Sequence, residues 1–300
     1  MITGCTTPTK LQSPTSPSES TAGSPGWILV NPPNPNNDLS AIWGTSSSDV
    51  FAVGGLGTIL HYNGKTWSNM SSGGTNWFYA VWGSSSSDVF VVGTDGTILH
   101  YNGQEWSNMT SGSSDLLCGV WGSSSSDVFA VGKDGIILHY NGKAWSNIYS
   151  GGNNWFYGVW GSSSSDVFIV GNNGIILHYD GKQWTNMPAG GTDLLYAVWG
   201  SSASNVFVVG EESVGNGGII MHYDGKAWTN TSTANALECV YGNTASDIFS
   251  VGFGGTILHY DGGTWTTMAG GMTNDLSGVW EGEGSSSPVF VVGTEVAPLQ

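Results

Sequence analysis

Short apolar runs separated by small polar residues recur along most of the chain. A typical unit reads LYAVWG, a serine-rich turn, DVFVVG, a second short turn, GTILHYNG and finally KTWSNM. These runs are too short for helices, show no helical periodicity, and are rich in β-branched and aromatic residues. The pattern therefore predicts four short β-strands in each unit and an all-β fold.

Glycine-containing pairs separate the apolar runs and predict tight turns. Pairs such as Asp95-Gly96 stand between the second and third runs, and pairs such as Asn63-Gly64 stand between the third and fourth. Asn-Gly and Asp-Gly supply the positive φ that a two-residue hairpin needs. Each unit is thus expected to be a four-stranded antiparallel meander.

One aromatic position marks the repeat. Trp43, Trp82, Trp121, Trp160 and Trp199 are each 39 residues apart, Tyr241 follows after 42, and Trp280 after 39 more. The run DVFVV is apolar on both of its alternating faces, so that strand needs a cover on each side. Sheets stacked face to face around an axis provide this cover, which predicts a β-propeller.

The chain ends indicate seven blades. Six complete units run from about Asp38 to Met268, and a seventh starts near 274 but stops at Gln300. Trp27 lies 16 residues before Trp43, much as an outer-strand tryptophan precedes the next unit. We therefore expect a propeller over residues 27–300 whose ring is closed by an N-terminal outer strand. A six-bladed ring with loose half-units would expose unpaired apolar strands.

The first 26 residues differ from the rest in composition. The stretch Ile-Thr-Gly-Cys, ending at Cys5, fits the lipobox of prokaryotic lipoproteins, and a Ser/Thr/Pro-rich segment follows it. Such a segment buries too little apolar surface to fold and is typical of a disordered tether. We expect a lipid attachment site at Cys5 and an extracytoplasmic, membrane-anchored or secreted prokaryotic protein. The alternative is a cytoplasmic protein with a ragged start.

Charge excludes one class of partner. The chain carries 22 acidic residues, six lysines and no arginine, with a formal net charge of −16. This charge repels phosphate backbones, and no guanidinium is present to bind them, so nucleic-acid binding is excluded. A neutral or cationic partner is favoured.

Serine and histidine recur in every full unit, and an aspartate recurs in all but the fifth, which has Asn205; these residues suggest catalysis only at first sight. The aspartate of SSDVF and the histidine of ILHY occur in near-copies around the ring, whereas a nucleophilic triad occurs once, in a cleft. We expect them to be structural. No spacing typical of a metal site is present, and no catalytic residue, metal or cofactor is predicted.

The repeat resembles a known group of propellers. The stretch VWGSSSSDVFAVG…GIILHYNGKAW resembles the WD40/YVTN/BNR-like repeats of secreted prokaryotic proteins, and HYNGKTW and HYDGKQW resemble a shortened Asp-box. Photosystem II assembly factor-type propellers and sialidases carry related repeats. The resemblance implies a propeller that hosts enzymes, assembly factors or binding modules, and the missing arginine argues against a sialidase.

Candidate ligand contacts lie where the repeats differ. Blades two and four begin with NWFY, which makes Trp77, Tyr79, Trp155 and Tyr157 a candidate aromatic platform near the channel mouth. Their alternative role is packing between blades. The insertion EESVGNGG adds Glu211 and Glu212 on the same face. 

These features predict a non-catalytic, monomeric cell-surface module that recognises a protein, peptide or glycan. An assembly factor for a membrane complex and a polysaccharide-active hydrolase or lyase are the alternatives.

Overall fold

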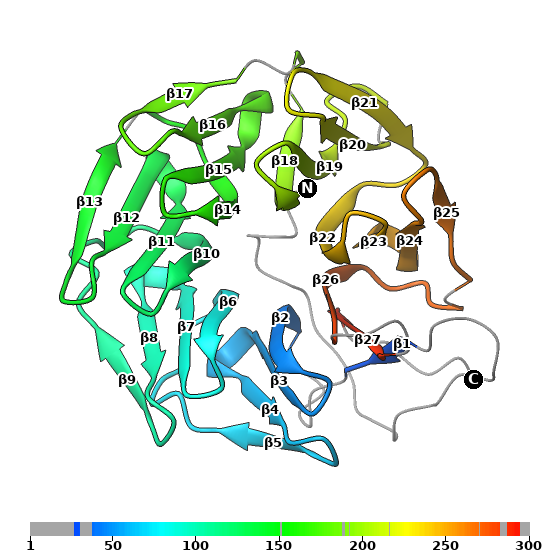
Figure 1. The fold of residues 1–300 in the computed structure, drawn as a ribbon. Coiled ribbons are helices and arrows are strands. Elements are labelled where there is room, and N and C mark those ends of the chain that lie inside the picture. The colour runs from blue at the N-terminus through cyan, green and yellow to red at the C-terminus, as the bar shows by residue number, and fades with distance from the viewer. Residues whose placement is uncertain are drawn as a thin grey trace.

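A computed structural model describes residues 27–30, 38–150, 152–187, 190–191, 193–215, 217–269, 271–282 and 287–294. Seven small sheets stand around a central axis like the blades of a propeller (Figure 1). The sequence-based prediction of a seven-bladed, all-β propeller is confirmed.

Six blades are four-stranded antiparallel meanders in chain order, each with its first strand innermost. Blades one and two contain β2 (Leu39–Ser46), β3 (Asp49–Gly54), β4 (Ile59–Tyr62) and β5 (Trp67–Met70), then β6 (Phe78–Ser85), β7 (Asp88–Gly93), β8 (Ile98–Tyr101) and β9 (Trp106–Met109). Blades three and four contain β10 (Leu117–Ser124), β11 (Asp127–Gly132), β12 (Ile136–Tyr140) and β13 (Trp145–Ser150), then β14 (Phe156–Ser163), β15 (Asp166–Gly171), β16 (Ile176–Tyr179) and β17 (Trp184–Asn186). Blades five and six contain β18 (Leu194–Ser202), β19 (Asn205–Glu211), β20 (Gly218–Tyr223) and β21 (Trp228–Thr233), then β22 (Leu237–Thr244), β23 (Asp247–Gly252), β24 (Thr256–Tyr260) and β25 (Trp265–Thr267).

The seventh blade joins the two ends of the chain. It contains β26 (Leu276–Glu281), β27 (Val289–Gly293) and the N-terminal β1 (Trp27–Leu29). The expected ring closure by an N-terminal outer strand is confirmed, since β1 is the outermost described strand of this sheet. Among the described residues β1 pairs directly with β27 and runs parallel to it, in the place of a third strand. The spacing of Trp27 from Trp43 indicates a strand but gives neither its direction nor its neighbour.

The core consists of layers between neighbouring blades. The second strand of each blade is almost fully buried, because its side chains alternate between the two adjacent interfaces. Its central phenylalanine is at most 2% exposed in all seven blades: Phe51, Phe90, Phe129, Phe168, Phe207, Phe249 and Phe290. The outer strands are half-exposed, with Trp67 and Met70 packed inward and Ser68 and Asn69 in solvent.

The two kinds of turn use their glycine pairs differently. Between second and third strands, Asp95 and Gly96 both have positive φ, at 55° and 65°, as the hairpin prediction requires. Between third and fourth strands only the glycine has positive φ, as in Gly64. There the Oδ1 of Asn63 accepts hydrogen bonds from two following backbone amides. The turns between second and third strands therefore use two successive left-handed residues, and the turns between third and fourth strands are Asx turns.

The repeated Trp-Gly dipeptide joins neighbouring blades. A Cβ added at Gly122 would lie 2.6 Å from Cη2 of Trp82 in the preceding blade. The same contact places Trp43 over Gly83, and Trp121 over Gly161. The indole needs a residue without a side chain beneath it, so the dipeptide is an inter-blade packing device.

Candidate functional site

The propeller has two chemically different ends. One end, here called the loop face, carries the turns between second and third strands and the connections that enter each first strand. Backbone bonds join these segments, as from Thr94 N to Trp77 O at 2.9 Å and from Lys133 N to Leu116 O at 2.9 Å. The opposite end, here called the serine face, carries the serine-rich turns and the Asx turns. The variable segments singled out in the sequence all belong to the loop face.

The repeated aspartates and histidines form structural ties near the serine face. In blade two, Asp88 Oδ1 lies 2.7 Å from His100 Nε2, and Asp88 Oδ2 accepts a 2.5 Å bond from Ser84 Oγ. The carboxylate thus joins the serine turn, the second strand and the third strand. The serine is bonded to the aspartate and not to the histidine, so no base is placed to activate it. Equivalent pairs occur in blades one, three, four and six.

The fifth blade carries an amide in this tie. Asn205 Oδ1 lies 2.6 Å from His222 Nε2, while Asn205 Nδ2 donates a 2.7 Å bond to Ser201. Because the amide oxygen only accepts, Nε2 of His222 must carry the proton. Burial lowers the pKa of His222 below its usual range.

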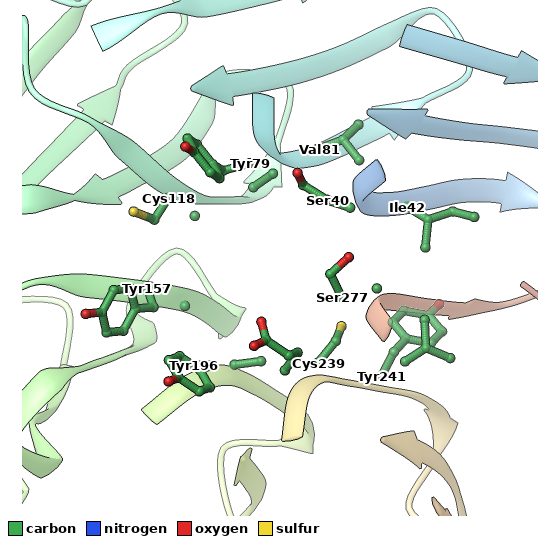
Figure 2. A pocket seen from close by; sticks show the side chains of 18 of the residues that line it. Ser40, Ile42, Tyr79, Val81, Cys118, Tyr157, Tyr196, Cys239, Tyr241 and Ser277 are labelled. Carbon is green, nitrogen blue, oxygen red and sulfur yellow. The ribbon is translucent and has the colours of Figure 1, made fainter. Parts of the chain in front are cut away.

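A central cavity of about 410 Å³ is lined by the first strands of all seven blades. Figure 2 shows Ser40, Tyr79, Cys118, Tyr157, Tyr196 and Ser277 arranged around it. Its lining is mostly apolar, with tyrosine, serine and glutamate groups among the apolar ones. Such a composition is typical of ligand sites, in which a few polar groups fix orientation.

A β-bulge in each first strand places one residue at this cavity. The pairing register skips one residue between first and second strands in every blade, for example between Phe78 and Ala80. The skipped residue lies free of the ladder at the innermost strand and lines the cavity. The skipped residues, here called the channel ring, are Ser40, Tyr79, Cys118, Tyr157, Tyr196, Glu238 and Ser277.

One side of the channel ring is aromatic and largely buried. The rings of Tyr157 and Tyr196 lie 5.6 Å apart, centroid to centroid. Tyr157 is only 7% exposed, and its hydroxyl has no hydrogen-bond partner within the described residues. Burial raises the pKa of Tyr157 to about 12 and raises that of Tyr79. These hydroxyls therefore stay protonated and can both donate and accept hydrogen bonds at neutral pH.

The two predicted tryptophans lie at the rim of the loop face and pack on neighbouring blades. Trp77 Nε1 donates a 3.0 Å bond to Ser40 Oγ, and its ring covers Gly55 in the turn of the preceding blade. The ring of Trp155 lies 5.8 Å from Nζ of Lys133, again in the preceding blade. Both indoles thus make inter-blade contacts and are half-buried, and only Trp77 also lines the cavity.

The structure separates the two predicted glutamates. Glu211 extends β19 and its Oε2 accepts a 2.9 Å bond from the Tyr196 hydroxyl, which brings it to the channel ring. Glu212 accepts a short bond from Ser232 Oγ on the outer strand β21, away from the axis. Only Glu211 therefore contacts a residue of the channel ring.

Sequence reasoning missed two members of the channel ring with ionisable side chains. Tyr196 and Glu238 lie three residues before the aromatic marker of their blades, as Tyr79 and Tyr157 do. That register could have identified them. The prediction instead relied on the NWFY segments, which occur only in blades two and four.

Other candidate features are limited. The lipobox-like Cys5 and the expected tether over residues 1–26 lie outside the described residues. Within the described part of the chain, no three His, Cys, Asp or Glu side chains are grouped as a metal site requires. No helix of the described residues is long and apolar enough to cross a membrane. Cys239 is a free thiol whose pKa burial raises to about 11.

Comparison with known proteins identifies the architecture. No family model matches the sequence, and no curated protein matches it. The structure is similar to YCF48 from Cyanidioschyzon merolae, with a TM-score of 0.65 at 15% identity over 86% of this chain and 93% of that one. It is similar to YCF48 bound to D1 peptide, with a TM-score of 0.69 at 14% identity over 86% and 89% of the two chains. The WD40 β-propeller domain of Doa1 gives a TM-score of 0.69 at 14% identity over 86% and 90%. At these identities the likeness establishes the fold alone, a seven-bladed β-propeller.

Proposed function

We propose that this propeller is a non-catalytic recognition module that binds a peptide or an extended protein segment at the loop-face mouth of its channel. The observation that carries the proposal is the channel ring, where seven bulges line one cavity with tyrosine, serine and glutamate side chains. Most other positions of the repeat carry the same residue types in successive blades, whereas the channel-ring positions differ from blade to blade. A surface that varies on a constant scaffold is suited to recognition.

Two further observations support this function. The repeated Ser-Asp-His sets are tied within their blades and have no serine next to a base, which removes the most obvious catalytic arrangement. A propeller of similar fold, YCF48, has been solved bound to D1 peptide. That likeness also favours a second candidate, an assembly factor that holds a segment of a membrane-protein precursor.

The cellular setting belongs to the same proposal. We place the propeller outside the cytoplasm on a tether formed by residues 1–26, lipidated at Cys5, as a secreted or cell-surface protein. Mass spectrometry of the N-terminal peptide tests this directly. A diacylglyceryl-modified Cys5 is expected, and an unmodified N-terminus in the native host would contradict it.

A random-peptide display library tests binding at the channel mouth. Peptides are selected on the wild-type protein and then measured on Ser277→Phe, which fills the cavity, and on Ser125→Phe in an exposed serine-face turn. Selected peptides should lose binding to the first variant and keep it for the second, with both variants showing wild-type thermal unfolding. Equal binding to both variants, or no enrichment at all, would overturn the proposal. A glycan array on the same three proteins tests the glycan alternative.

A further inference from the structure

The loop face of the propeller is acidic. Among the described residues, the loop face carries nine carboxylates: Asp38, Asp95, Asp115, Asp134, Asp193, Glu211, Glu212, Glu238 and Asp275. Lys133 is the one lysine that the described part of the chain places there. The other described lysines lie in the Asx turns of the serine face: Lys65, Lys143, Lys182 and Lys226. The serine face is acidic as well, with ten described carboxylates beside these four lysines, so the net charge attracts cations to both ends and only local groups can select the loop-face mouth.

Acidic groups continue from this rim into the cavity. Glu238 belongs to the channel ring and is only 7% exposed. In the neighbouring blade five, the Glu211 carboxylate accepts a hydrogen bond from the Tyr196 hydroxyl. Charge-assisted hydrogen bonds from an ammonium or guanidinium to a carboxylate are among the strongest available.

The tyrosines supply an independent indication of a ligand. Tyr157 is more than nine-tenths buried, lines the cavity, and has no partner for its hydroxyl within the described residues. Buried polar groups are nearly always paired, so an unpaired hydroxyl in a cavity wall indicates a missing donor or acceptor. A cationic side chain would supply donors, and the faces of Tyr157 and Tyr196 would attract its charge.

The protein contains its own example of such a contact. Lys133 Nζ lies 5.8 Å from the ring centroid of Trp155 and 3.8 Å from Asp134 Oδ2. A cation already sits between an indole and a carboxylate at this rim. The same two kinds of group, aromatic faces and carboxylates, line the adjacent channel mouth.

We propose that the loop-face mouth selects a cationic segment, and that one lysine or arginine side chain of the bound peptide enters the channel beside Tyr157, Tyr196 and Glu238. This inference rests on the proposed function and adds the chemical class of the ligand. The ammonium or guanidinium donates to the Tyr157 hydroxyl and to the Glu238 carboxylate, while the peptide backbone stays at the rim.

Matched synthetic peptides test the selection. Four fluorescent heptapeptides of the same Gly/Ser/Tyr background carry lysine, arginine, norleucine or glutamate at the central position, and polarisation gives each Kd. We expect lysine or arginine to bind at least tenfold more tightly than norleucine, and glutamate to bind weakest. Equal binding of all four would overturn the cationic selection and leave peptide binding standing. Failure of all four, together with failure of the display library, would overturn the proposed function itself.

Conservative variants locate the cation. Glu238→Gln and Tyr157→Phe each keep the side-chain shape, and each should weaken the lysine peptide at least fivefold while leaving the norleucine peptide within twofold. Glu105→Gln removes one charge from an exposed serine-face turn and should change neither peptide. If all three variants weaken the lysine peptide equally, the attraction is the net charge of the protein and the proposed position in the channel is wrong. Wild-type unfolding temperatures for the variants are required for each comparison.

Discussion

The Tyr196 hydroxyl donates a 2.9 Å hydrogen bond to Oε2 of Glu211, joining the bulge of β18 to the end of β19. Burial first, and then this bond to a carboxylate, raise the pKa of Tyr196 well above its usual range. The pair fixes a phenol ring of the channel wall against the insertion that lengthens blade five. It links the most irregular loop of the protein to the candidate site.

Tyr196→Phe should destabilise the fold by about 1–3 kcal/mol, since it removes a buried bond to a charged acceptor. Urea unfolding at neutral pH measures this change. Tyr149→Phe is the matched control, because the Tyr149 hydroxyl on β13 makes no hydrogen bond recorded within the described residues. An unchanged midpoint for Tyr196→Phe would show that the bond contributes nothing.

Gly122→Ala should destabilise the interface between blades two and three. The new Cβ would lie 2.6 Å from Cη2 of Trp82 and 2.8 Å from the backbone oxygen of Asp127, so we expect a loss of about 1–3 kcal/mol. Gly74→Ala is the control, because its Cβ meets nothing closer than 3.7 Å. Similar unfolding temperatures for the two variants would contradict the packing role of the Trp-Gly dipeptide.

The exception to this dipeptide predicts a coupled pair. Blade seven has Glu281 at the glycine position, and the preceding blade has Tyr241 in place of tryptophan. Tyr241→Trp should therefore destabilise the protein by about 1–3 kcal/mol in the wild-type background and by less in Glu281→Gly. A double-mutant cycle of unfolding free energies measures the coupling, and strictly additive values would refute it.

Glu281 also predicts a pH dependence. Burial first, and then the charge of Asp247, raise the pKa of Glu281 from 4.5 to about 7. A hydrogen bond donated by Asn243 lowers this pKa and offsets part of the rise. Since the folded-state pKa is the higher one, its contribution to stability is complete below about pH 4.5 and is lost as the pH rises through 7. Glu281→Gln should gain stability relative to wild type from pH 5 to pH 8, by at most about 3 kcal/mol. A difference that does not vary with pH would contradict the assignment.

His222 predicts a pH dependence of stability with the opposite sign to that of Glu281. Its lowered folded-state pKa means that the unfolded chain takes up the proton first, so this histidine costs stability as the pH falls below 6.5. Asn205→Asp supplies a carboxylate at 2.6 Å and should raise the pKa of His222. Titration of the histidine Cε1–H signals by NMR follows the change. A His222 pKa that stays the same in the variant would show that burial alone controls it.

Much of the architecture was predictable because it repeats. The spacing from Trp43 to Trp280, the apolar second strands and the glycine pairs each report a local rule that holds in every blade. The parallel pairing of β1 with β27 was not predictable, because hydrophobic pattern indicates a strand but not its direction or its neighbour. The channel ring was half-predictable, since Tyr79 and Tyr157 were identified and Tyr196 and Glu238 were missed. Bulges depend on the register between strands, which a single sequence does not show.

Hydrogen exchange with a bound peptide tests the central claim most directly. The protein is measured with and without saturating central-lysine heptapeptide, and protection is compared across the fold. The account predicts slowed exchange at the loop-face ends of β14, β18 and β22, around Tyr157, Tyr196 and Glu238, and no change at the serine turn 84–88. Protection at the serine turns, or exchange that is the same with and without peptide at the channel ring, would contradict it.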